Sequence, residues 1–515
     1  MYRLLFVLLC CAIVPATFGQ TLQQELSDLE WRIIPGVPTG NAMSNLFATV
    51  NPMKQSVGNF EASRCIVSPD EIAVLVNYRK DDYGVLLLDS KLKIKWNTPL
   101  TGTPLGMGKL GDKIIIITTP DITITGWKNQ FDALLLEPAT GKVITRKNIY
   151  KGSEDYFMEP KLFFIPKDNS FKLGIRKSLL TKSVKISFFG SGVEKAMTAG
   201  RSTSSFELIS INGQLETTGK VELPVKKDLQ FLDCGNNSEG VLFFSYYEGG
   251  QNIGLQRISP DGTNSEDYRH VSFDARDKSG FNTGFFISRA EPDVAYITIE
   301  CTNSDKDKTL GIYRIDFRQT GNQNDVTVLT KAYKKEHKND YSPFNKDAGK
   351  PDTDLWNNLK TVAVLDHEDK VIVVNEVQFT QLIERTGIMW NTGDAIVSLY
   401  DKKMHLQSQV IIPKEMRILT SIGSASSYFI RGNKLYILSA NSHKITYNAL
   451  YVCIDLATGK LLQYSHPDRG EAKKRNPVDP GSTLWFRDGF MVNYLDPSGF
   501  LVIKKISTDS QKFSY

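Results

Sequence analysis

The chain has 515 residues, of which 41% are hydrophobic and 23% are charged, and its formal net charge is +5. This hydrophobic content is ample for a buried core. The charge is small for the length and argues against a nucleic-acid-binding protein.

Residues 1–19 are predicted to be a signal peptide. The sequence MYR forms a short positive region and LLFVLLCCAIV an apolar region. The following PATFGQ contains the small residues of a cleavage region, and we expect cleavage after Gly19. A membrane anchor is the alternative, but the apolar run is shorter than the ~20 residues that a spanning helix needs. No later stretch is apolar enough to span a bilayer. We therefore expect a secreted or periplasmic protein whose mature domain covers residues 20–515.

The mature chain contains eight copies of one β-rich repeat unit. Each unit has a short apolar run, a tight polar turn, a β-rich run, a loop of variable length, a second β-rich run and a Gly/Asp/Asn turn before a last strand. The second and third strands of the eight units are Ile72–Tyr78 with Val85–Asp89, Lys113–Thr118 with Ala133–Glu137, Phe171–Arg176 with Phe206–Asn212, Val241–Tyr246 with Ile253–Ser259, Val294–Ile299 with Leu310–Phe317, Val371–Glu376 with Ala395–Asp401, Lys434–Ser439 with Leu450–Asp455, and Phe490–Tyr494 with Phe500–Lys504.

Such a unit cannot bury both of its faces alone, so the copies must stack. The pattern predicts an all-β fold, a single closed β-propeller of eight four-stranded antiparallel blades, with seven blades as the alternative because the third and fifth units are the least regular. The last unit lacks a fourth strand. We expect Trp31–Ile34 to supply it by pairing near Phe500–Ile506, which would close the ring and remove an exposed sheet edge.

The turns PATGKVI and LATGKLL resemble those of quinoprotein-type (PQQ-like) β-propeller repeats of secreted bacterial proteins. The resemblance covers nearly the whole mature chain in pattern. It implies the propeller fold and a binding or assembly role, as in the non-enzymatic relatives. The vicinal cysteine pair and the cofactor-stacking tryptophans of a quinoprotein dehydrogenase have no counterpart here, so we expect no cofactor.

Motifs for known chemistry are absent or incomplete. The chain has no GxSxG or HExxH string, and its six histidines show no metal-ligand spacing. NSDKDKTLG, from Asn303, begins like a calcium loop but has Lys308 where glycine is needed, so a hairpin loop is favoured and no metal site is expected. The four cysteines of the mature chain are predicted to be buried strand residues, with disulfides as an open alternative: Cys65, Cys234, Cys301 and Cys453.

Loop length is the feature that points to a functional face. The turns between first and second strands are all short, whereas the long segments fall among the second-to-third loops and the connections between blades, which share the other face. These long segments are Pro120–Gln130, Lys177–Ser204, Lys331–Leu359, Val377–Gly393 and Ser465–Gly481. We call this side the long-loop face and the opposite side the turn face.

Aromatic and basic residues gather in these segments. The predicted ligand-binding residues are Trp127, Trp356, Arg385 and Trp390, because aromatic rings beside cations suit sugars, acidic polymers or peptides. The basic clusters are Lys182/Lys185/Lys195/Arg201, Lys334/Lys335/Lys338 and Lys473/Lys474/Arg475. Packing of the tryptophans onto the scaffold, with solvated lysines, is the alternative interpretation.

The pattern favours a monomeric binding protein that takes a protein, a glycan or another anionic envelope polymer on its long-loop face. A polysaccharide-active hydrolase or lyase is the second hypothesis, with Glu376 and Glu384 as its first candidate acids, and it requires two carboxylates about 5–9.5 Å apart at the central channel. A structural subunit of an envelope complex is the third, and would leave a large apolar patch.

Overall fold

The computed structural model describes residues 64–507 with gaps, together with two short strands at 21–24 and 32–33. The residues left out between 64 and 507 are 69, 78–82, 92, 121, 124–125, 128–129, 153–155, 166–169, 180–202, 228, 262–266, 277–280, 339–349, 384–386, 419–425, 444–445, 467–477, 487–488 and 496–500.

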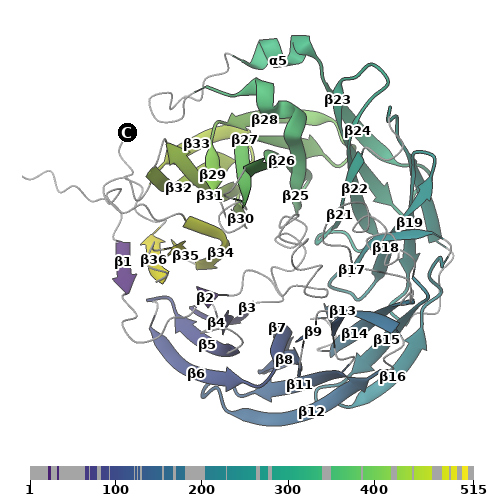
Figure 1. The fold of residues 1–515 in the computed structure, drawn as a ribbon, viewed down its shortest axis with the longest axis vertical. Coiled ribbons are helices and arrows are strands. Elements are labelled where there is room, and N and C mark those ends of the chain that lie inside the picture. Colours follow the sequence, from purple (N-terminus) through teal and green to yellow (C-terminus); the bar gives the residue numbers. More distant parts are fainter. Residues whose placement is uncertain are drawn as a thin grey trace, which may run out of the picture.

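The chain is folded into antiparallel sheets that follow one another around a common centre (Figure 1). The first sheet contains β2 (Arg32–Ile33), β3 (Arg64–Ser68), β4 (Glu71–Asn77), β5 (Tyr83–Asp89) and β6 (Ile94–Leu100). The second contains β7 (Thr103–Leu110), β8 (Lys113–Thr119), β11 (Gln130–Leu136) and β12 (Val143–Lys151), beside a two-stranded ribbon of β9 (Ile122–Thr123) and β10 (Gly126–Trp127). The third contains β13 (Tyr156–Ile165), β14 (Ser170–Leu179), β15 (Ser205–Ile211) and β16 (Thr217–Glu222).

The remaining sheets continue in chain order. They contain β17 (Gln230–Asn236), β18 (Leu242–Gly249), β19 (Asn252–Ile258) and β20 (Asp267–Ser272); then β21 (Phe281–Ile287), β22 (Val294–Thr302), β23 (Lys308–Asp316) and β24 (Gln323–Leu329). After the helices α5 (Lys331–His337) and η2 (Thr353–Asn358) come β25 (Leu359–His367), β26 (Lys370–Ile383), β27 (Gly387–Asp401), β28 (Leu406–Ile412) and β29 (Met416–Ile418). The last two hold β30 (Ser427–Arg431), β31 (Lys434–His443), β32 (Thr446–Asp455) and β33 (Lys460–Ser465), and β34 (Val478–Phe486), β35 (Gly489–Leu495), β36 (Leu501–Ser507) and β1 (Thr21–Gln24).

The all-β propeller arrangement predicted from the repeats is confirmed. Every predicted pair of second and third strands is present as two antiparallel neighbours, from β4 with β5 to β35 with β36. The prediction that all sheets have four strands is wrong: in the described part of the chain six sheets have four strands and two have five. The additional strands are β2 at the edge of β4 and β29 at the edge of β27.

The N-terminal strand lies at a different place from the one predicted. Thr21–Gln24, not Trp31–Ile34, pairs with β36, in the register Thr21 with Ile506 and Gln24 with Ile503. Arg32 and Ile33 pair instead with Asn77 and Val76 of the first sheet. The apolar segment was the wrong guide because pairing at a sheet edge uses backbone hydrogen bonds, which the polar sequence TLQQ supplies equally well.

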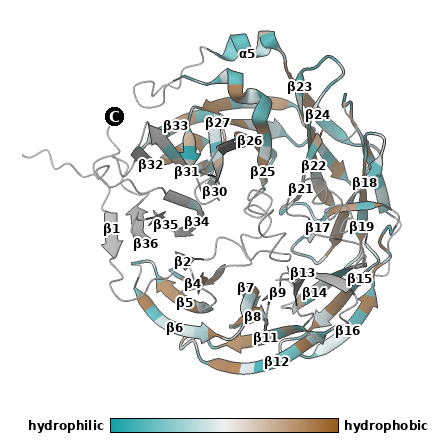
Figure 2. Ribbon diagram, in the orientation of Figure 1, coloured by the Kyte–Doolittle hydropathy of each residue, from teal (hydrophilic) through white to brown (hydrophobic). Residues whose placement is uncertain are grey.

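Burial explains why the middle strands are so apolar. All side chains between the ends of β5 are buried, and so are those of Ile114–Thr119 in β8, because neighbouring sheets cover both faces of each middle strand. The outermost strands are covered on one side only, so β6 alternates half-buried and exposed residues. Figure 2 shows the apolar strand segments alternating with polar ones around the ring, and α5 as a polar element at its margin. The core therefore consists of contacts between sheets.

Two glycines permit close approach of the innermost strands. A Cβ on Gly108 of β7 would lie 2.3 Å from the Phe164 ring of β13, in the next sheet. A Cβ on Gly235 of β17 would lie 2.6 Å from the Ile287 side chain of β21. Each large side chain fills the space that its glycine leaves open, because the sheets converge toward the centre.

The turn face is closed by side-chain caps at the ends of the third strands. Asp89 Oδ1 accepts hydrogen bonds of 2.8 Å from the backbone N–H groups of Lys91 and Lys93. Asn212, Asp401 and Asp455 cap the equivalent turns of their own sheets in the same manner. The Asp and Asn residues that mark the turns in the sequence are therefore structural, since they satisfy backbone donors.

Candidate functional site

The long-loop face carries the helical part of the structure. α5 and η2 lie in the connection between β24 and β25 and pack against each other and against the sheet below. The Thr330 hydroxyl caps α5 by accepting a hydrogen bond of 3.1 Å from the Tyr333 N–H. The sequence shows no helical periodicity here, because α5 has only seven residues and none of them is buried. A capping threonine was its one local signal.

Basic side chains of α5 are accessible. Lys331, Lys335 and Lys338 are exposed, whereas Tyr333 and His337 are half-buried. The Tyr333 and His337 rings lie 6.2 and 6.1 Å from the Trp356 ring. The predicted cluster Lys334/Lys335/Lys338 is thus held on an anchored helix, with Lys334 donating a 2.6 Å hydrogen bond to Asn357. The other two predicted basic clusters fall outside the described residues.

Beneath this face lies a buried ion pair. Glu376 of β26 is fully buried, and Lys414, in the connection after β28, is 8% exposed; the ammonium group of Lys414 contacts Glu376 Oε1. Ser426 donates a 2.7 Å hydrogen bond to the same oxygen, and Gln378 donates one of 2.6 Å to Oε2. The carboxylate therefore has a partner at both oxygens, as a buried charge requires.

The pair joins two sheets. Ser426 stands immediately before β30, and its hydroxyl lies 2.7 Å from that of Ser439 on β31. Lys414 also donates a 3.3 Å hydrogen bond to Ser426. Burial, together with the charge of Glu376, raises the pKa of the Tyr428 phenol well above its usual value, so that phenol stays neutral. Lys414, Ser426 and Ser439 escaped the sequence analysis because they come from distant segments with no shared motif.

A second buried acid occupies the corresponding position of the preceding sheet. Glu300 stands six residues after the first residue of β22, as Glu376 does in β26. Its Oε1 accepts a 2.7 Å hydrogen bond from the Thr361 N–H of β25, in the next sheet. Burial raises the pKa of Glu300 and lowers that of Lys308, whose charge acts on Glu300 in the opposite direction to burial. Both acids thus fasten one sheet to the next on the long-loop side.

Asp394 anchors the strap formed by residues 350–358. The carboxylate is 3% exposed, and its Oδ2 accepts hydrogen bonds of 2.9 Å from Trp356 Nε1 and 2.7 Å from the Asp352 N–H. Burial raises the pKa of Asp394 to about 6, although these hydrogen bonds favour the charged form. The strap therefore rests on a buried acid whose pKa is raised.

The structure places two of the four predicted ligand residues. Trp356, a residue of the strap, is fully buried, and Trp390 of β27 is 9% exposed. Trp127 belongs to β10, but its side chain lies outside the described residues, as does Arg385. In this structure Trp356 and Trp390 pack against the scaffold, which favours the packing interpretation for these two, and their predicted role in binding stays a prediction.

Glu376 and Glu384, the candidate acids of the hydrolase or lyase hypothesis, are not described as an exposed pair. Glu376 is buried and paired with Lys414, and Glu384 lies outside the described residues. Among the described residues no group of three or more His, Cys, Asp or Glu side chains could hold a metal ion. The four cysteines there are free thiols, all buried. Within the same part of the chain, no helix is both long and apolar enough to cross a membrane.

Comparison with known proteins gives matches in structure only. No family model matches the chain, and no curated protein matches it. Among solved structures, puromycin hydrolase is 11% identical with a TM-score of 0.37; the match covers 84% of this chain, which spans only 58% of that protein. The β-propeller domain of the trilobed protease from Pyrococcus furiosus is 9% identical with a TM-score of 0.37, covering 80% and 97% of the two chains.

A third match is the Nup133 β-propeller domain of Vanderwaltozyma polyspora, 9% identical with a TM-score of 0.35, covering 84% of this chain and 91% of that domain. At these identities the likeness concerns the fold alone. The resemblance to quinoprotein-type repeats stays a prediction from the short turn motifs.

Proposed function

We propose that this protein is an exported β-propeller that binds an anionic macromolecule on its long-loop face. The observation that carries the proposal is the difference between the two faces. Tight, self-capped turns close the turn face, whereas the long-loop face bears α5 with its exposed lysines. Binding residues concentrate on long segments that a rigid scaffold holds in place.

The anchoring of α5 supports this role. Tyr333 donates a 2.9 Å hydrogen bond to Gln409 of β28, and its ring packs near Trp356, so the helix is tied to the sheet on two sides. Lys331, Lys335 and Lys338 are thereby presented in a fixed arrangement, which lowers the entropy cost of binding an anionic polymer. Complementary charge also steers the encounter.

Export and ring closure belong to the same proposal. The predicted signal peptide, residues 1–19, lies outside the described residues, and its cleavage after Gly19 would leave Gln20 as the first residue of the mature chain. The pairing of β1 with β36 supports the expectation that an N-terminal strand closes the last blade. A closed ring has fewer exposed sheet edges, as an exported monomer requires.

The test measures binding of the purified mature protein to immobilised heparin and to poly-glutamate at several salt concentrations. The triple variant Lys331→Glu, Lys335→Glu, Lys338→Glu is expected to bind at least roughly tenfold more weakly, with a shallower salt dependence.

The matched control reverses three exposed lysines of the turn face, Lys91, Lys93 and Lys142, which gives the same net charge. This control is expected to bind within about twofold of the wild type, because the effect depends on position and not on total charge. An equal loss in both triple variants, or no binding to either polyanion, would contradict the proposal.

A further inference from the structure

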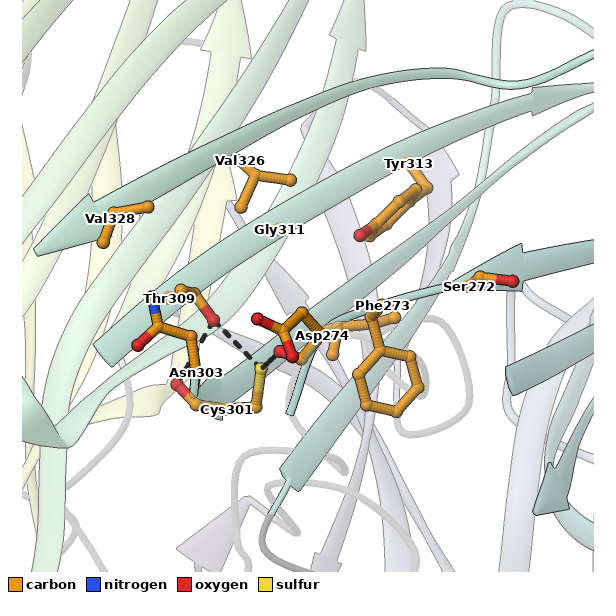
Figure 3. A pocket seen from close by; sticks show the side chains of 11 residues that line it. Ser272, Phe273, Asp274, Cys301, Asn303, Thr309, Gly311, Tyr313, Val326 and Val328 are labelled. Carbon is orange, nitrogen blue, oxygen red and sulfur yellow. Dashed lines mark hydrogen bonds between the residues drawn. The ribbon is translucent and has the colours of Figure 1, made fainter. Parts of the chain in front are cut away.

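A small pocket lies between the β17–β20 sheet and the β21–β24 sheet. Its volume is about 250 Å³. One wall is the segment that leaves β20, with Phe273 and Asp274, and the floor is formed by β22, β23 and β24. Figure 3 shows Asp274, Cys301, Asn303 and Thr309 gathered at one end, with Phe273 and Tyr313 farther along.

Strand alternation makes this pocket apolar at its base. Cys301, Thr309 and Tyr313 face the pocket, so the intervening residues Glu300 and Lys308 must point to the other side of the sheet. Gly311 keeps the floor open: a Cβ there would lie 2.9 Å from the Tyr313 ring. Val326, directly opposite Gly311 in the register of β23 and β24, is 42% exposed and forms the outer rim.

The polar groups of the pocket are suited to hydroxyl groups. Asp274 is exposed, and its side chain accepts one recorded hydrogen bond, of 3.3 Å, from Ser304. Asn303 adds an amide NH2 donor, since its Oδ1 already accepts a 2.9 Å hydrogen bond from the Asp307 N–H. Thr309 adds a hydroxyl that donates a 3.3 Å hydrogen bond to the Cys301 carbonyl and can still accept one. None of the described residues that line the pocket is a lysine or an arginine, so these residues offer no cation to an anionic ligand.

Cys301 is not a reactive group in this pocket. Its thiol donates a 3.1 Å hydrogen bond to the Asp274 carbonyl and lies 2.9 Å from the Thr309 hydroxyl. Burial raises the pKa of the Cys301 thiol, which keeps it protonated and unreactive. Any ligand of this pocket is therefore held without a covalent bond.

We infer that this pocket binds a single neutral sugar ring, packed against the ring edges of Tyr313 and Phe273, each 8% exposed, and held through its hydroxyl groups by Asp274 and Asn303. The volume is below the ~300–1,000 Å³ of pockets for drug-sized ligands, which selects a ligand of one ring. Aromatic edges beside an apolar floor match the C–H faces of a pyranose, and the polar end matches its hydroxyls. This inference is independent of the anion-binding face.

The test titrates the mature protein with glucose, galactose and N-acetylglucosamine, using calorimetry and saturation-transfer NMR. At least one pyranose is expected to bind with a Kd on the order of 1 mM. Val326→Trp is expected to abolish binding, because the indole would lie across Gly311 and fill the pocket. Asp274→Asn is expected to weaken binding roughly tenfold through loss of a charged acceptor. Since Asp274 is exposed, this second variant leaves the core untouched.

Val221→Trp is the matched control. Val221 is a 36% exposed valine on β16, the outermost strand of another sheet, and its replacement should leave binding unchanged. Absence of binding at about ten times the expected Kd, equal loss in both tryptophan variants, or tighter binding of choline than of any pyranose would overturn the inference. The triple charge-reversal variant of α5 should bind the pyranose normally, which separates this site from the anion-binding face.

Discussion

Replacing Lys414 by Met should destabilise the protein far more than any surface charge does. The change keeps the length of the side chain and removes the cation that contacts Glu376, a residue with no exposed surface. Removing one partner of a buried ion pair costs about 3–5 kcal/mol, because the other charge stays behind without compensation. Ser426 and Gln378 still donate hydrogen bonds to Glu376, which places the expected loss near the lower end.

The free energy of unfolding is measured by urea denaturation followed by tryptophan fluorescence. The control is Lys113→Met on the turn face, where the 30% exposed lysine side chain pairs with Asp112 at 3.1 Å and with Glu137 at 3.2 Å, both of them solvated carboxylates. Loss of such solvated pairs should cost much less than loss of the buried pair. The double variant Lys414→Met, Glu376→Gln should recover at least half of the single loss, since no buried charge remains. A cost for Lys414→Met no larger than that of the control, or a double variant worse than the single one, would refute the reasoning.

Three further outcomes are expected. Because the folded-state pKa of Asp394, about 6, lies above its unfolded value, the native state binds the proton more tightly and this group stabilises the fold as pH falls. Wild type should therefore gain about 1 kcal/mol between pH 7 and pH 5 relative to Asp394→Asn, measured by paired urea melts; equal pH profiles would contradict this. Trp356→Ala should cost about 3–5 kcal/mol, and a melting temperature within a degree or two of wild type would show that the strap does not depend on this ring. Deleting residues 20–36 should lower the melting temperature by removing β1 and β2, and an unchanged melt would make them dispensable.

The repeating strands could be predicted because their signal is local. The strands β4, β8 and β22 are buried on both faces. Each therefore appears in the sequence as a continuous apolar run, which can be recognised without knowledge of the tertiary structure. The position of β1 could not be predicted, since an edge strand such as TLQQ is selected by backbone pairing and leaves no apolar pattern. The five-stranded sheets escaped prediction because their additional strands, β2 and β29, have only two and three residues.

The site was less accessible to prediction than the fold. Glu376 was named because it lies beside a long loop, but its partners Lys414 and Ser426 are 38 and 50 residues away in sequence. Trp356 was predicted to bind a ligand, with packing onto the scaffold as the alternative, and its burial could not be read from its place in a long segment. Contacts that join separate sheets depend on the tertiary arrangement, and no spacing rule along the chain encodes them.

The contacts between neighbouring sheets differ from one another in chemistry. Phe164 enters the space above Gly108 at one junction, whereas Glu376 meets Lys414 and Ser426 at another. Each sheet therefore fits the next sheet along the chain and not the others. An incorrect neighbour would leave a buried charge unpaired, or would leave an aromatic ring without the space above a glycine that it fills. Removal of one internal sheet should consequently bring together two sheets whose facing side chains do not fit.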